Sequence, residues 1–68
     1  MDLVLLSRSY PLPTGAVARV DLLQDSSLVK RWEVTILLRT SRGVLVGSIT
    51  RRKTRTDAMR LVRKAIHG

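Results

Sequence analysis

The feature that most constrains the fold is a segment whose polarity alternates with a period of two residues. Residues 29–40 read VKRWEVTILLRT, and alternate positions hold the large apolar side chains Trp32, Val34, Ile36 and Leu38. This period places them on one face of a β-strand, with Arg31, Glu33, Thr35, Leu37 and Arg39 on the other. The tripeptide SRG at 41–43 supplies a turn, and residues 43–50 continue as an apolar, β-branched run. We therefore expect an antiparallel hairpin over residues 30–50.

Two further strands precede this hairpin. Residues 16–24, AVARVDLLQ, alternate in the same way, and the side chains that share a face are Ala16, Ala18, Val20 and Leu22. The segment PLPTG at 11–15 disfavours a helix because it holds two prolines and a glycine, and DSS at 25–27 is typical of a second turn. We expect strands over about residues 2–10, 16–24, 29–40 and 43–50.

A single helix is expected at the C-terminal end, over about residues 55–67. The sequence TRTD at 54–57 fits a capping box with Thr54 as the N-cap, and Thr56 is the alternative cap. Apolar side chains then recur at helical spacing, at Ala58, Leu61, Val62 and Ala65. The fold class is therefore α+β: one domain, residues 1–68, in which a three- or four-stranded antiparallel sheet is followed by a C-terminal amphipathic helix.

The second face of this sheet also needs a cover. One short helix covers a single face, yet Leu37, Leu23, Val17 and either Leu45 or Val46 are directed to the other. Closure of the sheet into a small barrel would bury them, and so would a symmetric dimer. Because a chain of 68 residues builds only a small core, we expect a homodimer.

The net charge of +8 is distributed unevenly along the chain. Residues 42–68 hold eight basic residues and one acid, Asp57, whereas residues 1–41 hold five basic residues and four acids. The two parts therefore carry +7 and +1, and such one-sided clustering creates a field that attracts polyanions. The candidate nucleic-acid-binding residues are Arg42, Arg51, Arg52, Lys53, Arg55, Arg60, Arg63 and Lys64.

This basic cluster is the best indication of function. Arginine predominates over lysine in it, which favours bidentate contacts to phosphate, and residues 51–55 form a basic connector leading into a helix N-terminus. The chain has only two aromatic residues, Trp32 and Tyr10, and the phase of Trp32 assigns it to the core rather than to a base-stacking platform. We expect a small nucleic-acid-binding protein that prefers duplex DNA and contacts its phosphates. Two alternatives stay open: a cluster that only aids solubility, and a non-enzymatic inhibitor or adaptor, of the kind phages and mobile elements encode, that docks on an acidic protein surface.

Enzymatic chemistry, cofactors and metals are not expected. The chain has no cysteine and a single histidine, His67, whereas a catalytic metal site needs about three protein ligands. Its four glycines are isolated and form no phosphate-binding loop. The apolar run at residues 3–6 is far shorter than the ~20 residues that span a bilayer, so we expect no membrane partner and a cytoplasmic location.

Overall fold

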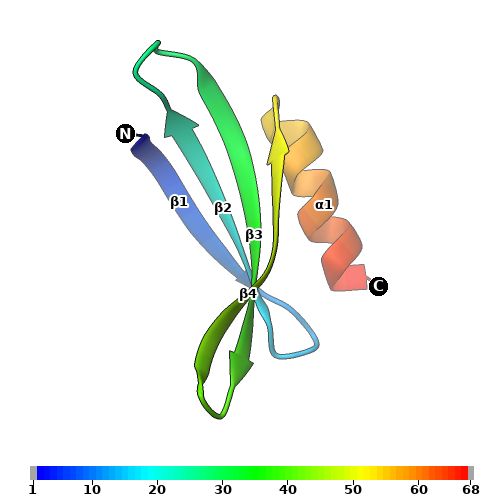
Figure 1. The fold of residues 1–68 in the computed structure, drawn as a ribbon. Helices are drawn as coiled ribbons and strands as arrows, with labels where there is room; N and C mark the ends of the chain where they lie inside the picture. Colours follow the sequence, from blue (N-terminus) through cyan, green and yellow to red (C-terminus); the bar gives the residue numbers. More distant parts are fainter. Residues whose placement is uncertain (1, 68) are drawn as a thin grey trace.

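The computed structural model describes residues 2–67 as a four-stranded antiparallel sheet followed by one helix (Figure 1). The strands are β1 (Leu3–Pro11), β2 (Val17–Gln24), β3 (Lys30–Thr40) and β4 (Gly43–Arg52), and the helix is α1 (Arg55–His67). The strand order is β1-β2-β3-β4 and the sheet is open, so β1 and β4 are its edges and no barrel closes. The expected α+β fold class is confirmed.

The core lies between α1 and one face of the sheet, which we call the helix side. Ala18, Val20 and Val34 from the strands and Ala58 and Val62 from α1 are each at most 3% exposed. Side chains packed around this cluster include Tyr10, Leu12, Trp32, Ile36, Met59, Leu61 and Ile66. The predicted inward phase of β2 and β3 is therefore correct at their centres.

The inward assignment of Leu38 is wrong, because this side chain is 44% exposed. The space between α1 and the sheet is lined by Val34, Ile36, Ser48 and Thr50, together with Leu61, Lys64 and Ala65. Leu38 pairs with Leu45, nearer the β3–β4 turn, and lies outside that set. The thirteen-residue helix is too short to cover the whole hairpin.

Thr54 is the N-cap of α1, as expected. Its hydroxyl accepts a hydrogen bond from the backbone N–H of Asp57 at 3.2 Å, and its carbonyl accepts one from Ala58 at 3.1 Å. The alternative cap, Thr56, lies inside the helix.

The helix-free side of the sheet is partly covered by its own side chains. Thr35 is 2% exposed and Asp21 is 6% exposed, although neither lies on the helix side. Asp21 and Glu33 lie opposite each other across the β2–β3 ladder, and each pairs with an arginine: Arg19 at 3.0 Å and Arg51 at 3.3 Å respectively. Leu37 lies between Val17 and Val46 on this side. Of the two residues that the sequence left open, Val46 and not Leu45 is therefore directed to this face.

No helix within the described residues has the length and apolar character needed to cross a lipid bilayer. The homodimer expected from the sequence stays a prediction.

Candidate nucleic-acid interface

The basic residues before α1 belong partly to β4. This strand continues to Arg52, two residues beyond its predicted end, so Arg51 and Arg52 belong to the sheet rather than to the predicted connector. Arg51 pairs in register with Glu33 and Arg52 with Trp32, and they therefore face opposite sides of the sheet. Lys53 follows in the short connection, and Arg55 is the first residue of α1.

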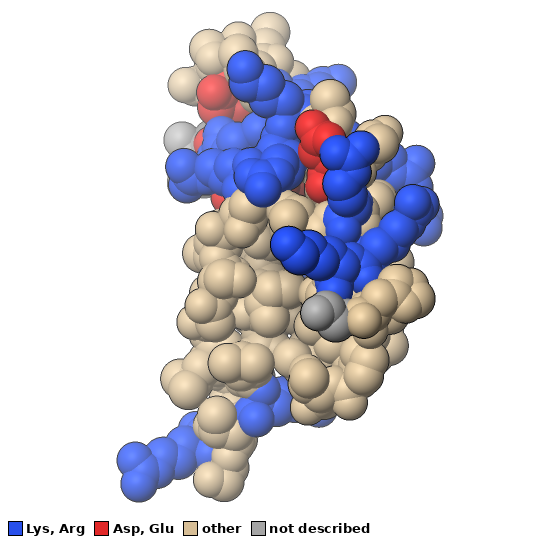
Figure 2. Space-filling model, turned by 90° about the vertical axis from the view of Figure 1, so that its right-hand side faces the viewer, with Lys and Arg blue, Asp and Glu red and all other residues tan. Residues whose placement is uncertain are grey.

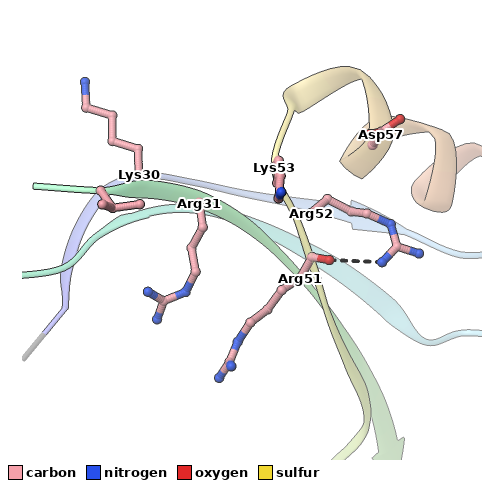
Figure 3. Close-up of a pocket in the computed structure, with 7 residues that line it drawn as sticks. Lys30, Arg31, Arg51, Arg52, Lys53 and Asp57 are labelled. Atoms are coloured by element: carbon pink, nitrogen blue, oxygen red, sulfur yellow. Dashed lines mark hydrogen bonds between the residues drawn. The ribbon is translucent and has the colours of Figure 1, made fainter.

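The start of β3 adds two cations to this group. Lys30, Arg31, Arg51, Arg52 and Lys53, with Val29 and Asp57, line a hollow of about 660 Å³ (Figure 3). In Figure 3, Arg31 and Arg51 point to the same side of the sheet and Lys30 points to the other. We call these five cations together with Arg55 the basic end. The sequence reasoning missed Lys30 and Arg31, although the predicted hairpin already implied that the start of β3 lies beside the end of β4.

Acidic side chains neutralise part of the basic end. Arg51 pairs with Glu33, Arg31 pairs with Asp2, and Arg60 on α1 lies 3.6 Å from Asp57. Arg52 donates a hydrogen bond from Nη1 to the carbonyl oxygen of Arg51 at 2.9 Å. Among residues 2–67, no carboxylate lies within ion-pair distance of the exposed Lys30, Arg52, Lys53 or Arg55. Within the basic end, these four cations are the ones free to meet an external anion.

Along α1 the basic residues divide between two rows. Arg55, Met59 and Arg63 are spaced by four residues and, with Thr56, line a hollow of about 300 Å³. Arg60 and Lys64 form the neighbouring row, and Lys64 borders the space between α1 and the sheet. All of these cations are exposed, so α1 extends the basic end along two lines rather than as one strip.

Arg42 lies apart from the other predicted residues. It occupies the β3–β4 turn beside Arg39, and the ten residues of β4 separate it from the basic end by roughly 30 Å at about 3.3 Å per residue. Figure 2 shows basic side chains gathered toward both ends of one face, with uncharged residues between them. The structure therefore divides the predicted set between two ends of the molecule.

The turn between β2 and β3 ends at Val29, which lines the hollow. Oδ1 of Asp25 accepts hydrogen bonds from the Ser27 N–H at 2.9 Å, the Ser27 hydroxyl at 2.6 Å and the Val29 N–H at 3.1 Å. These bonds, the hydroxyl's foremost, lower the pKa of Asp25 below its ordinary value. The turn also holds Leu28 at a φ of 66° with 74% of the residue exposed, an unusual conformation for a leucine.

Both aromatic residues lie against the core. Trp32 and Tyr10 are half-buried and pack on the buried cluster under α1. Stacking of an unpaired base requires an open ring face, so this packing favours the core interpretation of Trp32.

In comparisons with known proteins, the chain matches no family model, no curated protein and no solved structure.

Proposed function

We propose that this protein binds a nucleic acid, with duplex DNA preferred, through contacts between the basic end and backbone phosphates. The observation that carries the proposal is the convergence of five cations around one hollow: two from the start of β3, two from the end of β4, and Lys53 from the connection to α1. Their clustering raises the electrostatic free energy of the folded protein, and a bound polyanion lowers it. A role in solubility alone needs no such convergence.

The chemistry of these side chains suits phosphate. Arg52 and Arg55 carry guanidinium forks that donate two parallel hydrogen bonds to phosphate oxygens, and Lys30 and Lys53 add point charges. The basic end also adjoins the N-terminus of α1, where the helix dipole favours an anion. The positive surface extends along α1 through Arg60, Arg63 and Lys64. Arg42 lies about 30 Å from the basic end, so only a duplex that continues over that distance could contact both.

The duplex preference follows from the aromatic residues. Proteins that bind single strands stack bases on exposed rings, and here Trp32 and Tyr10 are engaged in the core. Without exposed rings, the basic end can bind a nucleic acid only through its charge and shape. The phosphates of a duplex form a regular array that suits such contacts.

The test is a fluorescence anisotropy titration of labelled duplex DNA, duplex RNA and single-stranded DNA with wild-type protein and two matched variants. Arg52→Gln/Lys53→Gln removes two unpaired cations of the basic end, whereas Arg8→Gln/Arg39→Gln removes two exposed arginines elsewhere. We expect the first variant to weaken duplex binding several-fold more than the second. Both variants lose the same net charge, so a difference in affinity reports the position of the cations. Equal losses would show that only net charge matters, and an absence of wild-type binding at ~50 mM salt would refute the function, because screening is weak there.

A further inference from the structure

The outer strand β4 carries an exposed aliphatic surface that neither α1 nor β3 covers. Val44, Val46 and Ile49 are each between 56% and 59% exposed and lie on the helix-free side of the sheet by their register with β3, and we call these three residues the aliphatic band. Large aliphatic side chains exposed side by side on one strand mark an interaction surface more often than chance exposure does.

Two structural facts leave this band uncovered. Strand β4 is the last in the sheet, so within the described residues no segment pairs with its outer edge. The space beneath α1 is lined on β4 by Ser48 and Thr50, and the aliphatic band is not part of that lining. An exposed strand edge with apolar side chains is a template for another extended segment.

Both ends of the band are positively charged. Arg39 and Arg42 lie at the turn where β4 begins, and Arg51 and Arg52 lie where it ends. Glu33, the carboxylate that pairs with Arg51, is only 16% exposed in its side chain. Figure 2 shows this pattern as an uncharged middle between two basic ends.

This charge pattern decides which occupant fits. A second copy of the chain, paired antiparallel along β4, would place Arg42 of each copy near Arg51 and Arg52 of the other, so like charges would meet at both ends. A segment with carboxylates at both ends meets the same positions with opposite charge.

We propose that β4 is a docking site for an extended protein segment whose aliphatic centre is flanked by acidic residues. The segment covers the aliphatic band, and its carboxylates pair with Arg42 at one end and with Arg51 or Arg52 at the other. Its length is about ten residues, the length of β4 itself. This site goes beyond nucleic-acid binding, since its apolar centre lies outside the basic end.

The probe is a labelled peptide of about ten residues with valine and isoleucine at its centre and two glutamates at each end, titrated with wild-type protein. One control peptide carries lysines in place of the glutamates, and another carries serines in place of the aliphatic centre. We expect both controls to bind at least ~10-fold more weakly, which corresponds to about 1.4 kcal/mol. Equal binding of the glutamate and lysine peptides, or no binding of any peptide at ~1 mM, would overturn the proposal.

Two variants locate the site on β4. Val46→Ser/Ile49→Ser removes apolar surface from exposed positions, so it should abolish peptide binding and leave duplex DNA binding unchanged. Arg42→Glu should weaken the glutamate peptide and strengthen the lysine peptide, a reversal that misfolding cannot produce. Unchanged affinities for both variants would overturn the site.

The two proposals fail separately. Peptide binding without duplex binding would refute the nucleic-acid function alone, and duplex binding without peptide binding would refute the docking site alone. If light scattering shows that Val46→Ser/Ile49→Ser dissociates a wild-type dimer, the band is a self-interface and the docking proposal fails.

Discussion

Trp32 and Arg52 lie directly opposite each other across the β3–β4 ladder. Trp32 packs against the core under α1, and Arg52 lines the hollow of the basic end. Trp32 therefore contributes to the stability of the fold, and its cross-strand neighbour Arg52 contributes to the candidate interface.

Replacing Trp32 should destabilise the fold strongly. Because the ring is half-buried, we expect Trp32→Ala to lower the free energy of unfolding by about 3 kcal/mol, the low end of the range for this change. Small domains have roughly 5–15 kcal/mol in total, so urea denaturation should show a large shift. A stable variant that had lost only single-strand binding would instead identify the ring as a stacking platform.

The salt dependence of duplex binding should count the phosphate contacts. Five or six contacts predict a slope of log K against log[salt] near −5, at about −0.9 per contact. Arg52→Gln/Lys53→Gln should flatten that slope by about 2, measured by anisotropy at several salt concentrations. A variant that binds more weakly with an unchanged slope would place these side chains outside the phosphate contacts.

Asp25 should make the β2–β3 turn sensitive to acid. Its pKa is lowered in the folded protein, so the stability it contributes is present above its ordinary value of 3.8 and is lost as the pH falls through the lowered folded value. Wild-type protein and Asp25→Ala should therefore differ in unfolding free energy at pH 6 and converge at strongly acidic pH. A difference that is independent of pH would mean that the carboxylate charge plays no part in the turn.

The unusual backbone of Leu28 should be relieved by glycine. Leu28→Gly removes a side chain that disfavours a φ of 66°, and we expect a gain of up to about 1 kcal/mol, or several degrees in Tm. Val29→Gly is the matched control, because no positive φ occurs there and glycine only adds freedom to the unfolded chain. Equal destabilisation by both variants would contradict this account of the turn.

The homodimer expected from the sequence would bury Leu37 and its neighbours on the helix-free side of the sheet. Leu37 is half-buried there and lies beside Val17 of β2. Leu37→Glu should therefore give monomers or insoluble protein, because it places a charge in the contact between the two copies. Light scattering of wild-type protein at 7.6 kDa over a wide concentration range would contradict the dimer.

Local patterns in the sequence were enough to predict the order of the elements and the cap of α1. The alternation around Val34 and the hydroxyl of Thr54 act over a few residues, so they can be recognised without knowledge of the tertiary fold. Positions that depend on distant segments could not be recognised in this way. Leu38 is exposed because α1 is short, and Thr35 is buried by neighbours on other strands.

The candidate site was predicted in part. The cations at residues 51–55 were identified from their clustering, whereas Lys30 and Arg31 join them only through the register of the hairpin. The choice between Leu45 and Val46 stayed open because an irregularity at Gly47 shifts the phase of β4, and alternation alone cannot locate such a shift. Arg42 was grouped with the basic end by sequence distance, although β4 carries it to the opposite end of the molecule.

Gly47 affects the twist of β4 but not the register in which β4 pairs with β3. The ladder pairs Ile36 with Ser48 and Leu37 with Val46, so Gly47 is the one residue of β4 between them without a partner of its own. Deleting it leaves both pairs in place, while the local twist that a bulge adds is lost. The angle between the turn at Arg42 and the basic end would then change with no change in register. A variant that lacks Gly47 would hold the same two groups of cations in a different relative orientation, and so would fit a differently curved partner.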